Sequence, residues 1–387
     1  MRVLALAPSL PWPLDAGGRL RTYHLLRALA PRHELHLFGV RQPGAGPEAE
    51  EALRAAGLDL TGFERSPASG LTALWSPRPA RWFHSRGLRL ALGAPGALDP
   101  FDLVHLDEPC LLPALPRELR RPLVVHHHKL DLELARDLAP PGARRSLEVA
   151  RWRRLEDEAV ERSVHHLFCS AEDARRFKAR HPRVEARVVE NGFDPTHYRP
   201  APHELREQQR LLVLGSLDYA PNLRGLERFL REVWPPLAAR APELRLAVVG
   251  RGAPAGLGRG WPRGVELVGA VDDVRPWLAR ATALVVPLEV GGGTRLKIIE
   301  AAASECPVVS TAVGAEGLAL HDGEHLWSAE DLVGLGPALA RALECGAERR
   351  RRAERAAALV RRRYPWELSA ARLEEAWDVV ARSTVSR

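Results

Sequence analysis

Short apolar runs alternate with amphipathic helical stretches along nearly all of this chain, and few folds accommodate that alternation. It predicts parallel sheets covered by helices, an α/β architecture that occurs twice along the sequence. The apolar runs have the length of buried strands. In the first half they lie near 3–7, 35–40, 103–106, 123–125 and 166–169. In the second half they lie near 211–214, 246–249, 265–268, 283–286 and 308–310.

The length of the chain also favours two domains. Its 387 residues exceed what a single ordinary core buries. A polar stretch at about 194–207, which contains Pro195, Pro200 and Pro202, separates the two strand series. We therefore expect a boundary there, with a long helical tail over about 336–382. In such folds ligands bind beyond the carboxyl ends of the strands, so the default active site is a cleft between two such domains.

Residues 287–300 carry the most specific local pattern, a strand followed by a glycine triplet and a helix. Gly291–Gly293 lead into a predicted helix over 295–305, with Thr294 as its cap. Glycines let a backbone approach a phosphate, and a helix start presents free N–H groups to an anion. Lys297, Glu300 and Ser304 share the polar helix face, where we expect a cation and a carboxylate to overlook the loop.

Lysine is rare in this chain. Of its 56 lysines and arginines, only Lys129, Lys178 and Lys297 are lysines. Two of the three lie in candidate sites, which favours a specific use for an amine there. Three residues left over from a general bias toward arginine remain the alternative.

Further glycines follow predicted strands, at Gly215-Ser216, Gly250-Arg251 and Gly269-Ala270. In the first half Gly17-Gly18 precedes a helix expected over 20–30, either as a phosphate or acceptor turn or as a plain chain reversal. No GxGxxG motif opens either half, so the dinucleotide-binding pattern is absent.

Composition bounds location and partners. The formal charge is +7, and the four cysteines are scattered, which suits a reducing cytoplasm. The apolar start at residues 1–7 is stopped by Pro8, too early for a signal peptide, and no apolar run approaches a transmembrane length. The arginine runs 349–352 and 361–363 lack interleaved aromatics, which argues against nucleic acid. They leave a solvated helix or a peripheral contact with anionic membrane.

These motifs together resemble the retaining GT-B glycosyltransferases of family 4, in particular the branch that transfers sugars for exopolysaccharides and the cell envelope. The resemblance rests on 287–301, 307–311 and 314–318, and on four further segments in the same order: 17–21, 190–194, 215–222 and 269–274. It implies two Rossmann-like domains facing a cleft, at 1–195 on the acceptor side and 196–365 for the nucleotide sugar. A C-terminal helix at 366–387 would return to the first domain.

The resemblance also assigns roles to residues. Glu300 matches the second glutamate of the family's E-x7-E motif and would hold the ribose hydroxyls. The first glutamate falls at Gly292, and the first of two diphosphate-binding basic residues at Ser216, so both are absent here. We expect Arg224, Arg295 and Lys297 to share the diphosphate. The expected donor contacts are Gly17, Gly18, Gly215, Ser216, Gly250, Arg251, Gly291, Gly292, Gly293, Thr294, Arg295, Leu296 and Glu300.

Three consecutive histidines, 126–128, end a strand of the first half. Successive strand side chains point to opposite faces, so the three cannot share one metal ion, and we expect no metal. The family carries a histidine near this position, close to the donor sugar. His127 or His128 is the candidate, with a buried structural histidine as the alternative.

The predicted activity is transfer of a sugar, with retention and without metal or other cofactor, from a UDP- or GDP-linked donor to a glycan or lipid-linked hydroxyl. The predicted catalytic residues are His127, His128, Lys297 and Arg224, the cations stabilising the departing diphosphate. Two alternatives remain: a nucleotide-sugar epimerase of the same fold, and a nucleotide-sugar-binding protein without transferase activity. The sequence reveals neither the base, sugar and acceptor nor the oligomeric state.

Overall fold

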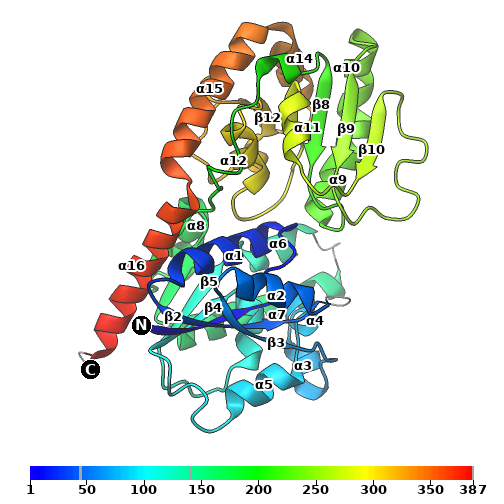
Figure 1. Cartoon of the computed structure of the whole chain (residues 1–387). Coiled ribbons are helices and arrows are strands. Elements are labelled where there is room, and N and C mark those ends of the chain that lie inside the picture. The colour runs from blue at the N-terminus through cyan, green and yellow to red at the C-terminus, as the bar shows by residue number, and fades with distance from the viewer. Residues whose placement is uncertain (43–45, 139–141, 386–387) are drawn as a thin grey trace. The chain divides into compact units, whose positions relative to one another are not determined.

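The computed structural model describes residues 1–42, 46–138 and 142–385. The chain forms two compact units (Figure 1). Unit 1 comprises Met1–Asn191 and Trp366–Arg387, and unit 2 comprises Gly192–Pro365. The first division therefore falls before the proline-rich stretch, between Asn191 and Gly192, rather than after residue 195.

Each unit is built on one parallel sheet, which confirms the predicted α/β class. Unit 1 has seven strands in the order β3-β2-β1-β4-β5-β6-β7. These are β1 (Arg2–Ala7), β2 (Glu34–Val40), β3 (Asp59–Phe63), β4 (Leu103–Asp107), β5 (Leu123–His127), β6 (His165–Phe168) and β7 (Ala186–Val188). Unit 2 has six in the order β10-β9-β8-β11-β12-β13. These are β8 (Arg210–Leu214), β9 (Arg245–Val249), β10 (Val265–Gly269), β11 (Ala283–Val286), β12 (Val308–Thr311) and β13 (Trp327–Ala329).

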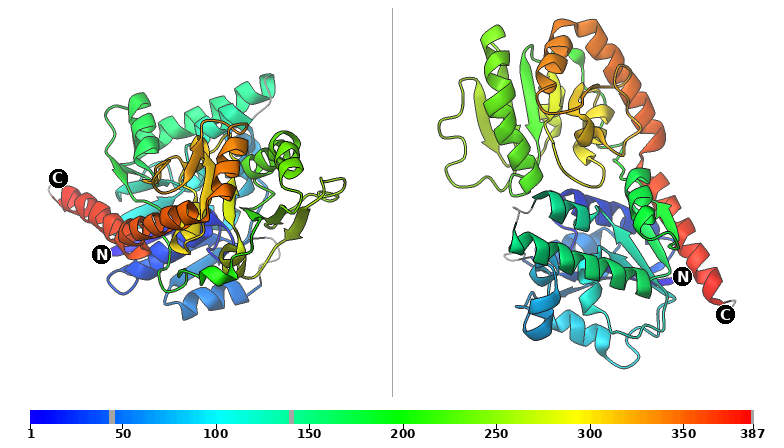
Figure 2. Two further views of the ribbon diagram at one scale, coloured as in Figure 1. Left: turned by 90° about the horizontal axis from the view of Figure 1, so that it is seen from above. Right: turned by 180° about the vertical axis from the view of Figure 1, so that it is seen from behind.

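Helices cover both faces of each sheet (Figure 2). Unit 1 contains α1 (Gly17–Leu29), α2 (Glu48–Ala55), α3 (Gly70–Trp75), α4 (Arg78–Trp82), α5 (Arg86–Gly93), α6 (Asp131–Leu138), α7 (Ala143–Arg162), α8 (Ala171–Arg180) and α16 (Trp366–Val385). Unit 2 contains α9 (Ala220–Arg228), α10 (Trp234–Arg240), α11 (Arg275–Arg280), α12 (Leu296–Ala303), α13 (Ala312–Ala315), α14 (Leu335–Glu344) and α15 (Gly346–Arg363).

The predicted helical tail is interrupted twice, so it forms three helices, α14, α15 and α16. Pro365, which has no N–H to donate, separates α15 from α16. Helix α16 packs against α1 and belongs to unit 1, where the buried Trp377 Nε1 donates to His105 Nδ1 at 3.2 Å. Among the described residues, no helix combines the length and apolar composition needed to cross a bilayer.

Candidate active site

The glycine turns of unit 2 meet at one edge of its sheet. Strands β9, β8 and β11 are neighbours and parallel, so the turns after Val249, Leu214 and Val286 lie at the same edge. The backbones approach closely here, because a Cβ on Gly250 would stand 1.9 Å from the Gly215 carbonyl oxygen. The absence of side chains on these glycines therefore lets neighbouring backbones and side chains approach closely at this edge.

The glycine triplet adopts conformations that favour glycine. Gly293 has φ +69° and Gly291 has φ +151°. The Arg295 side chain folds back on this loop, where its Nη1 donates to the carbonyl oxygens of Gly292 at 2.5 Å and Gly293 at 2.6 Å. The prediction that Thr294 caps the helix is wrong: Thr294 is buried, and Arg295 holds the N-cap position, where its side chain makes no capping hydrogen bond.

Lys297 lies at the end of β8, where its Nζ donates to the Leu214 carbonyl oxygen and, at 3.0 Å, to Asn222 Oδ1. A Cβ on Gly215 would come within 2.6 Å of this Nζ and would displace the amine, and the φ of +145° at this position also favours glycine. Burial, helped by the charge of Arg295, lowers the pKa of Lys297 to about 7. Its partners are neutral oxygens, which leaves this amine able to gain a proton beside an arriving anion.

Glu300 lies one helical turn after Lys297, and its carboxyl group is hydrogen-bonded to the hydroxyl group of Tyr198. Burial raises the pKa of this carboxyl, while the Tyr198 hydrogen bond and the Lys297 charge act in the opposite direction. Sequence reasoning missed Tyr198, because it lies in the irregular stretch after Asn191 and forms part of no spacing pattern. The structure thus supplies Glu300 with a fixed partner.

The other predicted donor residues of unit 2 are more scattered. Arg224 is exposed on α9, and Leu296 is buried in the core. Arg251 pairs with Asp218 at 3.2 Å, and the Ser216 carbonyl oxygen accepts from Asn222 at 2.9 Å. Of the three predicted diphosphate residues, Arg295 is close enough to Lys297 for its charge to lower the pKa of the amine.

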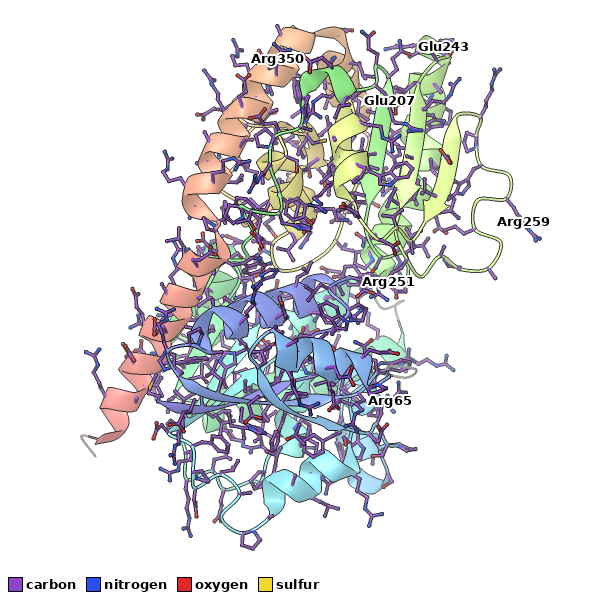
Figure 3. All side chains as sticks on the ribbon, viewed as in Figure 1. Arg65, Glu207, Glu243, Arg251, Arg259 and Arg350 are labelled. Atoms are coloured by element: carbon purple, nitrogen blue, oxygen red, sulfur yellow. The ribbon has the colours of Figure 1, made fainter. Side chains whose placement is uncertain are left out.

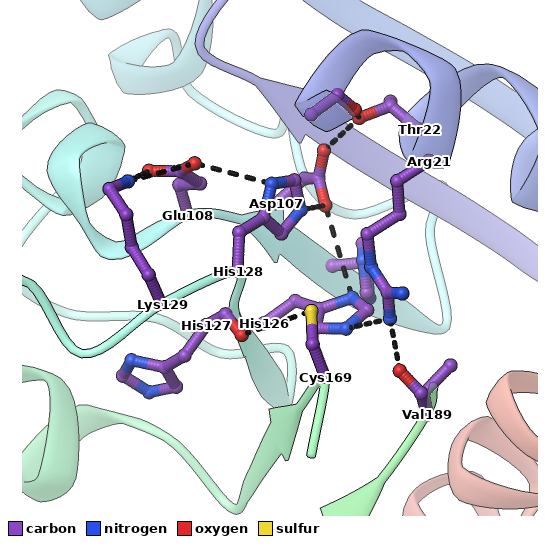
Figure 4. A network of polar contacts seen from close by, with 12 residues as sticks. Arg21, Thr22, Asp107, Glu108, His126, His127, His128, Lys129, Cys169 and Val189 are labelled. Atoms are coloured by element: carbon purple, nitrogen blue, oxygen red, sulfur yellow. Dashed lines mark hydrogen bonds and ion pairs between the residues drawn. The ribbon is translucent and has the colours of Figure 1, made fainter. Parts of the chain in front are cut away.

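In unit 1 the histidine run follows the alternation of the strand. Asp107 pairs with His126 in the register of β4 and β5, so His126 and then His128 share the face of Asp107, while His127 points to the other face. Figure 4 shows the resulting network of polar side chains around His128. The structure therefore divides the run between two environments.

His128 lies between two carboxylates. Its Nε2 is 2.7 Å from Asp107 Oδ1, and its Nδ1 is 3.2 Å from Glu108 Oε1. Burial lowers the pKa of His128, but these two carboxylates outweigh it and raise the value to about 9. A Cβ on Gly18 would lie 3.3 Å from its Nδ1, which places the imidazolium beneath the first turn of α1. The His128 imidazolium and the positive end of the α1 dipole thus lie together at Gly17-Gly18.

Glu108 has an unusual backbone, with φ +109° at the end of β4, and a non-glycine residue there is strained. Lys129 Nζ lies 3.1 Å from the Glu108 carboxylate and 3.3 Å from Asp131 Oδ1. Burial opposes the charge of Glu108, but Lys129 and His128 hold its pKa below the usual range. Sequence reasoning missed Asp107 and Glu108; their place directly after a buried strand was the available signal.

The structure does not support a catalytic role for His127. This residue is buried, its Nε2 is 2.9 Å from His166 Nδ1, and its ring stacks on Phe168 with centroids 4.9 Å apart. Burial and the neighbouring His166 keep its pKa well below the usual value. His127 is the buried structural histidine that the sequence left as the alternative.

Arg21 joins this network to the segment where the chain leaves unit 1. It is 1% exposed and donates to the Glu190 carbonyl oxygen at 3.0 Å and to Asn191 Oδ1 at 2.8 Å. Its Nη2 also contacts His126 Nε2. His105, Asp107 and His126 are close enough to hold a cation, but the Arg21 guanidinium opposes one there.

Models of known protein families match residues in both units of the chain. A model described as Glycosyltransferase Family 4 matches residues 16–197, and one described as Glycosyl transferases group 1 matches residues 208–345. The chain belongs to the family 4 (group 1) glycosyltransferases. Membership makes it a glycosyltransferase enzyme and places the glycine edge and the His128 network within the family's two matched regions.

Solved glycosyltransferase structures share this fold over the whole chain. HepE of Anabaena, in complex with UDP and glucose, is 15% identical with a TM-score of 0.69, covering 98% of this chain and 99% of that one. Sucrose-phosphate synthase of Thermosynechococcus elongatus is 17% identical with a TM-score of 0.76, covering 99% and 100%. WaaG, a glycosyltransferase involved in lipopolysaccharide biosynthesis, is 17% identical with a TM-score of 0.67, covering 98% and 99%.

One curated relative is an uncharacterized 44.6 kDa protein in the cps region of Klebsiella pneumoniae. It is 26% identical over 133 residues, which cover 32% of this chain. The match spans only 34% of that relative's length.

Proposed function

We propose that this glycosyltransferase moves a sugar, with retention of configuration and without a metal, from a nucleoside-diphosphate sugar to the hydroxyl of a glycan or lipid-linked acceptor. The observation that carries the proposal is the placement of Lys297 and Glu300 on α12 beside the glycine ends of β8 and β11. A carboxylate suits ribose hydroxyls, and an amine with neutral partners suits a phosphate.

The protein's own cations supply the charge stabilisation that departure of a diphosphate needs. In unit 2 the cations are Lys297 and Arg224. The backbone N–H groups at the start of α12, which spans eight residues, add hydrogen-bond donors. Separately, within unit 1, we propose that the His128 imidazolium, which lies beside Gly18, attracts an anionic group to the Gly17-Gly18 turn. We propose that the leaving phosphate takes the acceptor proton, so that no further carboxylate base is required.

The known structures of relatives favour a uridine donor. HepE has been solved with UDP, with UDP and glucose, and with UDP-glucose. The cps-region relative and WaaG point toward polysaccharide or cell-envelope glycans as products. We further propose that the enzyme works in the cytoplasm, where nucleotide sugars are available, with a peripheral contact to membrane where the acceptor is lipid-linked.

A binding protein without transferase activity is the second candidate. Gly292 and Ser216 stand where the family has a glutamate and a basic residue, and both changes remove a side chain expected to touch the donor. Under this alternative, nucleotide would bind while no sugar is transferred.

A sugar-transfer assay with analysis of the product distinguishes these functions. The enzyme is incubated with UDP- and GDP-linked sugars and a set of glycan and lipid-linked acceptors, and the anomeric configuration of the product is determined by NMR. A product with the donor's configuration supports the proposal. An inverted product contradicts retention, an epimerised donor supports the epimerase, and nucleotide binding without any product supports the binding protein.

A further inference from the structure

Unit 1 exposes large apolar side chains on a group of short helices that the active site does not use. Leu74 and Trp75 end α3, Trp82 ends α4, and Leu147 lies in the first turns of α7. Their exposed fractions are 54%, 49%, 57% and 46%. Single exposed apolar residues are ordinary, but two tryptophans and two leucines on adjoining elements need an explanation.

Contacts with α7 bring these elements together. Arg151 Nε donates to the Leu74 carbonyl oxygen at 2.9 Å, and the backbone N–H of Arg78, at the start of α4, donates to Glu148 Oε1 at 2.8 Å. Glu148 is the neighbour of Leu147 in the chain. Helices α3 and α4 accordingly lie beside each other at one side of unit 1 in Figure 1.

Arginines accompany both tryptophans. The Arg65 guanidinium lies 3.8 Å from the Trp82 ring centroid, and that of Arg154 lies 5.2 Å from the Trp75 ring. Arg65 is exposed (Figure 3). We call Leu74, Trp75, Trp82 and Leu147, with Arg65 and Arg154, the tryptophan surface.

The two chain segments that form this surface are strongly positive. Residues 65–98 contain five arginines and no acidic residue, and residues 143–154 contain five arginines and one glutamate. These two segments thus carry nine net positive charges, while the whole chain carries +7. This charge attracts a negatively charged partner to this side of unit 1. Helix α15 is also strongly positive, but only the tryptophan surface joins this charge to large exposed apolar side chains among the described residues.

We propose that the tryptophan surface docks on an anionic lipid bilayer. Tryptophan prefers the boundary between headgroups and acyl chains, where leucine side chains also lose contact with water. Arginines beside them reach lipid phosphates, each adding attraction in an anionic leaflet. A second copy of the chain would bring the same positive charge and be repelled, and a nucleic acid would leave the exposed leucines without an apolar partner.

This surface differs from the arginine-rich α15, which the sequence singled out for membrane contact. On α15 Arg349 donates to the carbonyl oxygens of Ala342 and Leu343, and Arg351 and Arg352 both pair with Glu348. Large exposed apolar residues are not among those described on α15. The proposal rests on the proposed function only for its purpose, delivery of the enzyme to a lipid-linked acceptor; the binding itself requires no nucleotide.

Vesicle co-sedimentation of the full chain tests this. The vesicles consist of phosphatidylcholine alone or of phosphatidylcholine mixed with phosphatidylglycerol, without nucleotide. The apolar variant is Trp75→Ala with Trp82→Ala, and the charge variant is Arg78→Glu with Arg86→Glu. Matched controls change equally exposed residues of unit 2: Leu205→Ala with Val333→Ala, and Arg350→Glu with Arg355→Glu on α15. Circular dichroism verifies that each variant is folded.

We expect wild type and both controls to bind the phosphatidylglycerol vesicles and not the neutral ones, and each test variant to bind about tenfold more weakly. Equal binding of wild type to both vesicles, or loss of binding only in the α15 control, overturns the proposal. So does a wild type that ignores vesicles but binds duplex DNA, or that forms a dimer which the Trp75→Ala and Trp82→Ala changes abolish. Because sugar transfer to a soluble acceptor is measured separately, failure here leaves the proposed function standing.

Discussion

Two partly buried basic groups of this glycosyltransferase, Lys297 and His128, have pKa values shifted in opposite directions because their neighbours differ. Lys297 is surrounded by carbonyl and amide oxygens, with the charge of Arg295 nearby, and its pKa falls to about 7. His128 lies between Asp107 and Glu108, and its pKa rises to about 9. At neutral pH, therefore, His128 is charged before any ligand arrives, whereas Lys297 is poised to become charged when a diphosphate binds.

Nucleotide binding should consequently take up a proton. A diphosphate next to Lys297 raises the pKa of the amine, so affinity should be highest below pH 7 and should fall as pH rises from 7 to 9. Calorimetric titration with UDP in buffers of different ionisation enthalpy measures this uptake. Lys297→Met should bind UDP more weakly and without the pH dependence. Lys178→Met, which changes a lysine of unit 1, should keep the affinity and the pH dependence of the wild type. An affinity of wild type that does not vary with pH contradicts this role for Lys297.

The raised pKa of His128 makes a prediction about stability. A group whose pKa is higher in the folded state stabilises that state fully below its unfolded value of 6.5, and the contribution is lost as pH rises through about 9. The shift corresponds to about 3 kcal/mol. Urea unfolding of His128→Gln should show a lower stability at pH 6 and a smaller loss of stability between pH 6 and 9.5. His321→Gln, at an exposed position, should leave the profile of the wild type unchanged.

Tyr198 should matter through Glu300. Tyr198→Phe removes the hydroxyl that orients the carboxylate but keeps the ring, so nucleotide affinity should fall about tenfold. The effect should disappear in a Glu300→Ala background, because a positioning residue has nothing left to position there. Additive losses in the double variant would show that Tyr198 contacts the nucleotide independently.

At the scale of elements, the sequence predicted the central strands and the edge strand β10, and missed the other edge strands of the described sheets. The buried strands β1, β4, β5, β8, β9 and β11 are mostly apolar, and their short length and flanking turn residues favour strands over helices. The missed strands β3, β7 and β13 lie at the ends of their sheets, and β7 and β13 have only three residues each. Short edge strands carry too little pattern to be found from sequence.

The glycine turns of the candidate site could be predicted from the sequence, because they depend on backbone geometry. Glycines at strand ends mark close approach, and the two close contacts of Gly215 and Gly250 agree with that interpretation. The partners of the site residues were not predictable, because Asp107 and Glu108 reach His128 from a neighbouring strand, and Tyr198 reaches Glu300 from an irregular stretch of unit 2. Such contacts depend on tertiary packing rather than on spacing in the chain.

Gly225 tests this interpretation of glycines. A Cβ there would lie 2.0 Å from the Pro287 carbonyl oxygen, so Gly225→Ala must push α9 away from the end of β11. We expect unit 2 to lose about 3 kcal/mol of stability and nucleotide binding to weaken. Gly93→Ala on α5 meets no atom within 4 Å, and it should change stability by under about 1 kcal/mol. Thermal unfolding of both variants measures the contrast.

At the scale of the whole molecule, the division into two units predicts two sets of stability determinants. Trp377 is fully buried in unit 1, although α16 follows unit 2 in the chain, and Trp234 is fully buried in unit 2. Each Trp→Ala change should cost about 3–5 kcal/mol. In differential scanning calorimetry, Trp377→Ala should lower the unfolding temperature of unit 1, and Trp234→Ala should lower that of unit 2. If both variants shift the same single transition equally, the units unfold as one.

The donor site on α12 is the central claim, and titration of the purified protein with UDP and GDP by calorimetry tests it most directly. The variant Glu300→Ala is compared with Glu330→Ala, an exposed glutamate of the same unit. We predict that wild type and Glu330→Ala bind one of the two nucleotides, UDP in preference, and that Glu300→Ala loses this binding. Binding of neither nucleotide by wild type, or unchanged binding by Glu300→Ala, would contradict the account.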